Sequence, residues 1–172
     1  MKIGIRNGSM GFPEMAELFE QAAQIGFDGV ELDIRAAWED EPVMSAEGRA
    51  AIERLAEETG VEVPSLCIGA LWTYSPAATD PDTLEMSRRI IREAIAAAAD
   101  LGAKWILIPV TPSDEEISHE ECQRRWIAEM RDAAAEAEAA GIILCLENVG
   151  RGCGKSAEDL LALVGGIDSA AV

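Results

Sequence analysis

Glu147 is the residue whose position most clearly indicates chemistry, because a carboxylate there ends an almost wholly apolar run. The run is Ile142–Val149, and the alternation of side chains along a strand places Glu147 on the same face as Ile143 and Cys145. An ionised carboxylate in such surroundings costs free energy unless it meets a cation, a metal ion or hydrogen-bond donors. Glu147 is therefore a candidate catalytic group or metal ligand. A structural ion pair and a helix cap are the alternative interpretations.

Arg6 and Glu31 are two further charged residues on neighbouring expected strands, and strand alternation directs both toward the same end of the sheet. Together with Glu147 they could bind a polyol or a phosphate. A salt bridge from Arg6 to Glu31 or to Asp33, with a purely structural role, is the alternative. Trp72 lies in the long loop after the third expected strand, where an aromatic ring could stack on a sugar or fold onto its own loop.

The segment Gly150–Ser156 follows a strand and opens a helix, as a phosphate-binding loop does. A nucleotide-binding G-x-x-x-x-G-K-S motif would need glycine in place of Val149, so nucleotide binding is disfavoured and helix capping by Ser156 is the favoured interpretation. Glycines before a helix N-terminus can still hold a substrate phosphate. His119 is the only histidine, which excludes a two-histidine metal site, and we interpret it as a solvated residue at a helix start.

These residues depend on a repeated join in which glycine ends a helical pattern and a β-rich run follows. Glycine is favoured there because the residue after a helix often adopts a left-handed conformation. The joins are at Gly26, Gly60, Gly102 and Gly141, and the expected strands are Lys2–Arg6, Gly29–Ile34, Glu62–Ile68, Lys104–Val110 and Ile142–Val149. Ser156 and Asp159 resemble a capping pair that opens a fifth helix. Alternating strands and helices predict an α/β fold with a parallel sheet.

Two α/β architectures fit five such units. One is a partial (β/α)8 barrel consisting of about the first five units, and the other is a five-stranded, flavodoxin-like doubly wound sheet. In the second strand Val30 and Leu32 share one face while Glu31 and Asp33 share the other. A barrel interior accepts such carboxylates at its mouth, whereas a sheet covered by helices on both faces does not, so the pattern favours the barrel.

Composition narrows the classes of function. The 172 residues include 32 acidic and 14 basic side chains, a net charge of −18, which disfavours nucleic acid as a partner. Charged residues make up 27% of the chain and interrupt every apolar stretch before it could span a bilayer. No secretory leader pattern opens the sequence. The four cysteines show no C-x-x-C spacing and are expected to be reduced, which favours a cytoplasmic protein.

Several short segments, taken in order, resemble one family, that of the sugar phosphate isomerases/epimerases with a xylose-isomerase-like barrel, which includes ketose 3-epimerases and hexulose- and xylulose-phosphate enzymes. The segments are Lys2–Ile5, Gly26–Leu32, Leu101–Leu107, Leu146–Asn148 and Ser156–Leu161. The resemblance extends over essentially the whole chain.

The resemblance implies a divalent metal, Mn²⁺, Mg²⁺ or Co²⁺, at the barrel mouth. Its ligands in the family end the fifth to eighth strands, and only the first of them has a counterpart here, Glu147. Residues 1–172 are thus expected to form the N-terminal part of such a barrel as one domain, lacking the last three strands. The implied mechanism is proton transfer by glutamate through an enediolate.

The resulting hypothesis is a metal-dependent aldose/ketose isomerase or ketose epimerase acting on a sugar or sugar phosphate, with this chain inactive alone. Glu147 is the expected catalytic residue and metal ligand, and Arg6, Glu31 and Trp72 are the expected substrate contacts. The alternative is a non-catalytic truncated barrel that acts through association. An open sheet exposes the edges of its first and last strands, so a second copy of the chain is an expected partner.

Overall fold

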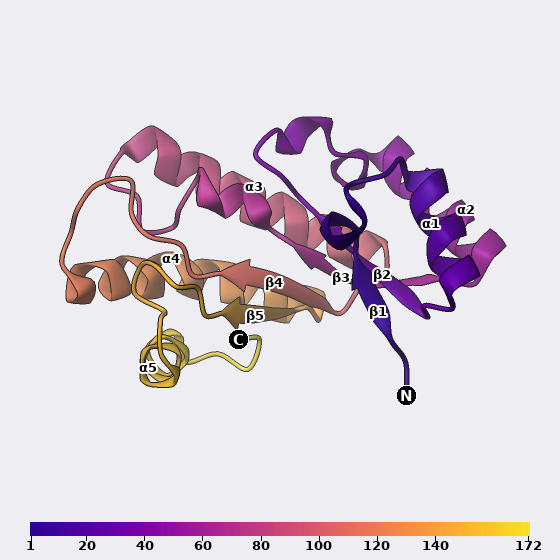
Figure 1. The fold of residues 1–172 in the computed structure, drawn as a ribbon. Helices are drawn as coiled ribbons and strands as arrows, with labels where there is room; N and C mark the ends of the chain where they lie inside the picture. The colour runs from indigo at the N-terminus through magenta and orange to yellow at the C-terminus, as the bar shows by residue number, and fades with distance from the viewer.

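A computed structural model describes all 172 residues, which form a five-stranded parallel sheet in the order β1-β2-β3-β4-β5. The strands are β1 (Gly4–Arg6), β2 (Gly29–Asp33), β3 (Glu62–Cys67), β4 (Trp105–Pro109) and β5 (Ile143–Glu147). The helices are α1 (Met15–Ile25), α2 (Ala46–Thr59), α3 (Pro81–Asp100), α4 (His119–Ala140) and α5 (Ala157–Ile167), with 3₁₀ turns η1 (Asn7–Met10), η2 (Trp38–Asp40), η3 (Pro42–Met44) and η4 (Gly69–Trp72). Each strand pairs with the next one along the chain (Figure 1).

The strand order distinguishes between the two expected architectures. A flavodoxin-like sheet places its first strand between the second and third, whereas here β1 is an edge strand that pairs with β2 alone. Successive addition of strands on one side is the topology of a barrel. The partial-barrel prediction is therefore confirmed, and the flavodoxin-like alternative is wrong.

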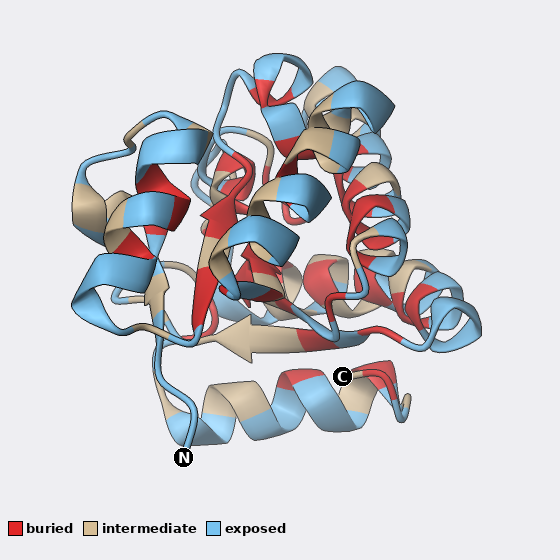
Figure 2. Cartoon of the chain, turned by 90° about the vertical axis from the view of Figure 1, so that its right-hand side faces the viewer, coloured by how far each residue is buried: buried red, intermediate tan, exposed pale blue.

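The two faces of the sheet differ sharply in composition. Buried residues gather on the strands and on the helix faces toward them (Figure 2). On the outer face of the sheet, toward the helices, the apolar side chains are fully buried, namely those of Val30, Leu32, Leu66, Ile106, Ile108 and Leu144. The inner face carries the polar and charged side chains, as strand alternation predicted. Trp105 and Ile143 lie on it and remain 46% and 42% exposed. The hydrophobic core thus lies between sheet and helices, and the inner face is open.

Register arranges the inner face in rows. Arg6 pairs with Glu31, Glu31 with Ser65, and Ser65 with Trp105. A second row, nearer the carboxyl ends of the strands, runs through Asp33, Cys67, Leu107 and Cys145, and beyond it Pro109 pairs with Glu147. The charged residues of the sequence prediction therefore share one face of the sheet.

The element ends are largely those that the sequence predicted. Ser156 and Asp159 form a reciprocal capping box at the start of α5, and Gly141 takes the left-handed conformation, with φ of 70°, after α4. The strands are one to three residues shorter than expected. Asn148 and Val149, for example, lie beyond β5, because the chain turns there into the loop before α5.

Helix α5 packs beside α4, and the Arg131 guanidinium donates to the backbone oxygen of Gly166 at 2.7 and 3.1 Å. The chain then returns to the free edge of β5, where the Leu144 N–H donates to the oxygen of Ala171 at 2.7 Å (Figure 1). None of the helices is both long and apolar enough to cross a membrane.

Candidate functional site

Arg6 and Asp33 form the most extensive polar contact of the inner face. The Arg6 Nε lies 3.0 and 2.9 Å from the two carboxylate oxygens, and its Nη2 donates to Oδ1 as well. The Asp33 side chain is 2% exposed and that of Arg6 41%. The Asn7 side-chain oxygen accepts from the Asp33 N–H at 3.2 Å, which fixes the end of β2. Of the alternatives for Arg6, the structure thus contains the salt bridge to Asp33, and the guanidinium is already paired.

Glu31 lies in the same row as Arg6, one row below Asp33, and is half-buried. The Ser65 hydroxyl donates to its Oε2 at 2.8 Å. Burial raises the pKa of the Glu31 carboxyl; the Ser65 hydrogen bond and the Arg6 charge oppose this, whereas the charges of Asp33 and Glu147 add to it. The net direction is upward, so Glu31 holds a proton more readily than an ordinary glutamate. Sequence reasoning missed Ser65, which becomes part of the site only through strand register.

Glu147 lies at the carboxyl end of β5, half-buried, on the inner face. Its side chain forms none of the ion pairs or hydrogen bonds of the structure, so neither alternative interpretation, ion pair or helix cap, is present. Its charge makes the smallest of the contributions that raise the pKa of Glu31. Glu147 is therefore a half-buried carboxylate without a side-chain partner, available to interact with a substrate hydroxyl group.

The thiols beside these carboxylates remain protonated. Burial raises the pKa of Cys67 well above its ordinary value, and burial and the charge of Glu31 raise that of Cys145. A thiolate nucleophile is consequently disfavoured. No group of three or more His, Cys, Asp or Glu side chains converges closely enough to hold a metal ion. The donors of this chain do not by themselves fit a divalent metal.

Trp72 ends the turn η4 after β3 and is 46% exposed. The Arg151 guanidinium lies over its ring, 4.8 Å from the centroid. The loops after β3 and β5 therefore meet at the carboxyl end of the sheet, and the indole packs on an arginine rather than on aromatics of its own loop. Sequence reasoning did not single out Arg151, although it recognised the glycine-rich loop in which it lies.

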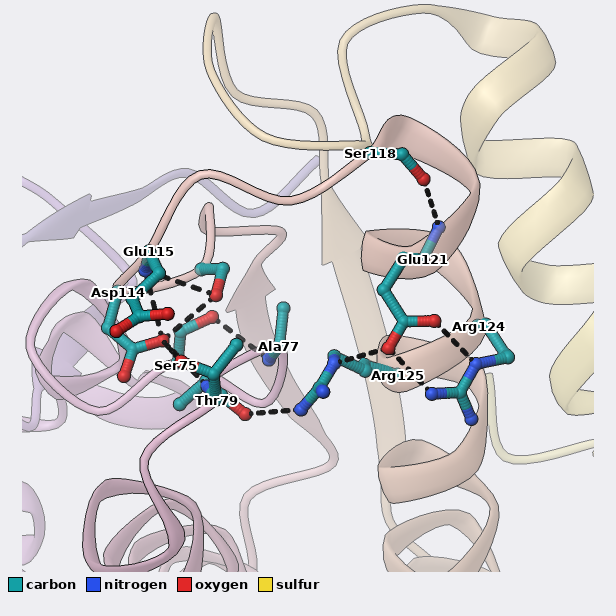
Figure 3. Close-up of polar contacts among 11 residues, drawn as sticks. Ser75, Ala77, Thr79, Asp114, Glu115, Ser118, Glu121, Arg124 and Arg125 are labelled. Atoms are coloured by element: carbon teal, nitrogen blue, oxygen red, sulfur yellow. Dashed lines mark hydrogen bonds and ion pairs between the residues drawn. The ribbon is translucent and has the colours of Figure 1, made fainter.

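The loops after β3 and β4 are joined by a network around Asp114 (Figure 3). Its carboxylate accepts from the N–H groups of Thr79 at 2.6 Å and of Asp80 at 3.0 Å. Asp114 is exposed, and the slight desolvation of its carboxylate raises its pKa, but these N–H donors and hydroxyl donors lower the pKa more, so that it lies well below its usual range. Arg125 of α4 donates to the Ala78 oxygen at 2.9 Å. The network holds the Trp72-bearing loop against its neighbour.

His119 is the first residue of α4, and its Nε2 lies 2.9 Å from the Asp159 carboxylate at the start of α5. Its side chain is 44% exposed, in agreement with a solvated residue at a helix start. It forms no contact with the inner-face carboxylates, so it joins the ends of two helices and is not part of the site.

Known proteins resemble the chain in both sequence and fold. The L-ribulose-5-phosphate 3-epimerase UlaE of Escherichia coli (strain SMS-3-5 / SECEC) is 27% identical over 139 residues, 76% of this chain and 47% of the relative. The structure of the 3-keto-D-glucoside 4-epimerase YcjR from E. coli superposes with a TM-score of 0.81 at 22% identity, covering 100% of this chain and 66% of that one. A xylose isomerase-like TIM barrel protein from Mycobacterium smegmatis in complex with magnesium gives 0.74 at 16% identity, covering 99% and 62%.

The curated relatives are sugar epimerases, and the chain spans about half of their length. The structural neighbours show the same fold, a barrel of which this chain covers the larger part. Residues 19–172 match the family described as Xylose isomerase-like TIM barrel. The open sheet, the strand order and this match together place the chain in the xylose isomerase-like TIM barrel family.

Proposed function

We propose that the chain supplies the N-terminal part of a sugar or sugar-phosphate epimerase or isomerase, with its substrate bound at the carboxyl end of the inner face. The observation that carries the proposal is Glu147, a half-buried carboxylate at a strand end with no partner among the side chains of the protein. Catalytic groups of such barrels cluster at this end of the strands. The sugar epimerases among the relatives support the substrate class.

Glu147 acts in this proposal as the base. It takes the proton from the hydroxyl-bearing carbon next to the carbonyl; the C–H electron pair forms a C=C bond, and the π pair of the carbonyl moves onto its oxygen to give an enediolate. A second acid on the opposite face, supplied by the rest of the complete barrel, then gives a proton to that carbon, and the C=C pair forms the new C–H bond as the carbonyl re-forms, which yields the epimer. Glu31, with its raised pKa and its bond to Ser65, binds a substrate hydroxyl as a hydrogen-bond donor or acceptor. Arg6 holds the Asp33 carboxylate at the carboxyl end of β2, and Trp72 borders the substrate.

A divalent metal belongs to the proposal for the complete barrel, in line with the magnesium of the M. smegmatis protein. Glu147 would be one of its ligands. Because three suitable donors do not converge in this chain, we derive no step through the metal. We expect Mn²⁺ to leave the melting temperature of the 172-residue chain unchanged, since only binding to the native state stabilises it. A clear metal-dependent increase would show that the ligand set is larger than Glu147.

Binding of a ketose to the whole chain tests the proposal. Saturation-transfer NMR with L-ribulose 5-phosphate is expected to detect binding, and Glu147→Gln is expected to weaken it about tenfold, the loss of one charged hydrogen bond. Glu57→Gln, on the exposed surface of α2, is the matched control and should bind like the wild type. Net epimerisation by the chain alone is expected to be absent. Absence of binding, or equal binding by Glu147→Gln and the control, would contradict the proposal.

Association is a second candidate function, favoured by the open inner face. Trp105 and Ile143 expose apolar surface there, and β1 has an unpaired edge of the kind that pairs with other strands. Sedimentation analysis is expected to find a dimer or larger species. A monomer at all concentrations would contradict this second function without affecting the first.

A further inference from the structure

The carboxyl end of the sheet contains three arginines that could receive an anion, and they differ in their partners. Arg6 ends β1 and is neutralised by Asp33, while Arg35 follows β2 and its Nε lies 2.5 Å from the Glu41 carboxylate. Arg151, after β5, has no carboxylate within ion-pair distance, although the chain contains 32 acidic residues. Its only defined interaction is with the face of Trp72.

Stacking on Trp72 orients Arg151 without neutralising it. The Arg151 guanidinium carbon lies 4.8 Å from the centroid of the Trp72 ring, and its N–H groups form no hydrogen bond within the protein, so they are free to donate. A planar guanidinium binds phosphate through two parallel hydrogen bonds. The Arg151 side chain is therefore in contact with Trp72, exposed and without a charged partner, in a protein where most other guanidinium groups are paired.

The loop that carries Arg151 is itself anchored. Gly152 has φ of 79°, and a Cβ at this position would lie 2.9 Å from the Pro112 nitrogen, so the loop rests on the backbone that follows β4. A Cβ at Gly154 would overlap the side chain of Val110. Both glycines are needed for this close approach. Arg151 is thus held four residues beyond Glu147 in the loop after β5, against Trp72 of the loop after β3.

We propose that Arg151, positioned by Trp72, binds the phosphate of a phosphorylated ketose whose reacting carbon lies at Glu147. This inference rests on the proposed function and assigns its substrate class, a sugar phosphate in preference to a free sugar. Lys155, the other cation of the loop, borders a cavity that also contains the carboxylates of Glu115 and Glu116, and is less suited to an anion.

Calorimetric or NMR titration of the whole chain with L-ribulose 5-phosphate and with L-ribulose tests this assignment. The wild type is expected to bind the phosphorylated sugar at least tenfold more tightly. Arg151→Gln is expected to reduce that preference to less than threefold. Arg151→Lys is expected to give an intermediate value, because lysine keeps the charge but lacks the paired N–H groups of the planar guanidinium. Arg54→Gln, an exposed arginine of α2 without an ion pair, is the matched control and should keep the full preference.

The outcomes separate this inference from the function on which it rests. If both sugars bind with equal affinity, or if Arg151→Gln keeps the wild-type preference, the phosphate assignment is wrong, while loss of binding in Glu147→Gln would still support the proposed function. If neither sugar binds, both are wrong. A phosphate preference that Arg54→Gln removes as fully as Arg151→Gln would indicate general electrostatics and would also overturn the assignment.

Discussion

The Arg6–Asp33 pair gives the sharpest test of the site geometry, through the substitution Asp33→Asn. Asparagine has nearly the shape of aspartate but lacks its charge, and its amide group faces the guanidinium with one oxygen rather than two. The substitution therefore removes the two-oxygen interaction with Arg6 while leaving the volume of the buried end of β2 unchanged.

The magnitude follows from the exposure of the two partners. Breaking a fully buried ion pair costs about 3–5 kcal/mol, whereas an exposed pair contributes about 0–1 kcal/mol. Here one partner is 2% exposed and the other 41%, so we expect a loss of about 2 kcal/mol in the free energy of unfolding. For a chain of this length each kcal/mol lowers Tm by roughly 2–4 °C. The expected decrease is therefore about 4–8 °C.

Thermal unfolding followed by circular dichroism at pH 7 measures this decrease. Asp28→Asn is the matched control, because the Asp28 carboxylate is exposed and accepts from the Ile3 N–H at 2.7 Å, a role that an amide oxygen can retain. We expect the control to melt within about 1 °C of the wild type. If Asp33→Asn melted at the same temperature as the control, the pair would not stabilise the mouth of the sheet, and the reasoning would be refuted.

Three further substitutions test the remaining geometry. Burial raises the folded pKa of Glu31 above its unfolded value, so the stability of the wild type falls as pH rises through the folded pKa. Glu31→Gln should therefore have a higher Tm than the wild type at pH 8 but not at about pH 4. The same Tm difference at both pH values would contradict this. The folded pKa of Asp114 lies below its unfolded value, so its contribution to stability is present above the unfolded pKa and is lost as pH falls toward the folded pKa. Because solvent screens this exposed carboxylate, Asp114→Ala should cost only about 1 kcal/mol at pH 7, and the difference from the wild type in urea unfolding should shrink below about pH 4. In α5, the added methyl group of Gly165→Ala meets open space, so this substitution should raise the free energy of unfolding by about 0.5–1 kcal/mol. The methyl group of Gly166→Ala overlaps Ile127 of α4, so this substitution should lower the free energy of unfolding by about 1–3 kcal/mol. Equal effects would show that α5 is not docked on α4.

The local elements and the two faces of the sheet were predictable from sequence because they depend on short-range patterns. Alternation around Glu31 and Glu147 set their common face, and glycine at Gly141 together with the Ser156 capping box set the helix ends. The pattern also indicated that Arg6 meets a carboxylate, but left open whether the partner was Glu31 or Asp33. That choice depends on strand register and side-chain reach.

The contacts between loops could not be read from the sequence. Asp114 and Thr79 are 35 positions apart, and their hydrogen bonds exist only because the loops after β3 and β4 are brought together by the sheet. The stack of Arg151 on Trp72 depends in the same way on two loops whose conformations are set by distant packing. An arginine in a glycine-rich loop of a strongly acidic chain was the available signal, and it became informative only when its partner was known.

The strand order has a consequence for how the chain acquires its structure. Because each strand pairs only with its predecessor and successor in the chain, every new pairing closes a loop of a few tens of residues and none must wait for a distant segment. The sheet can therefore grow outward from β1 in the order in which a ribosome delivers the strands. At each stage of synthesis the most recent strand offers an unpaired edge to the next strand, and in the structure Leu144 of β5 uses part of that edge to donate its N–H to the oxygen of Ala171.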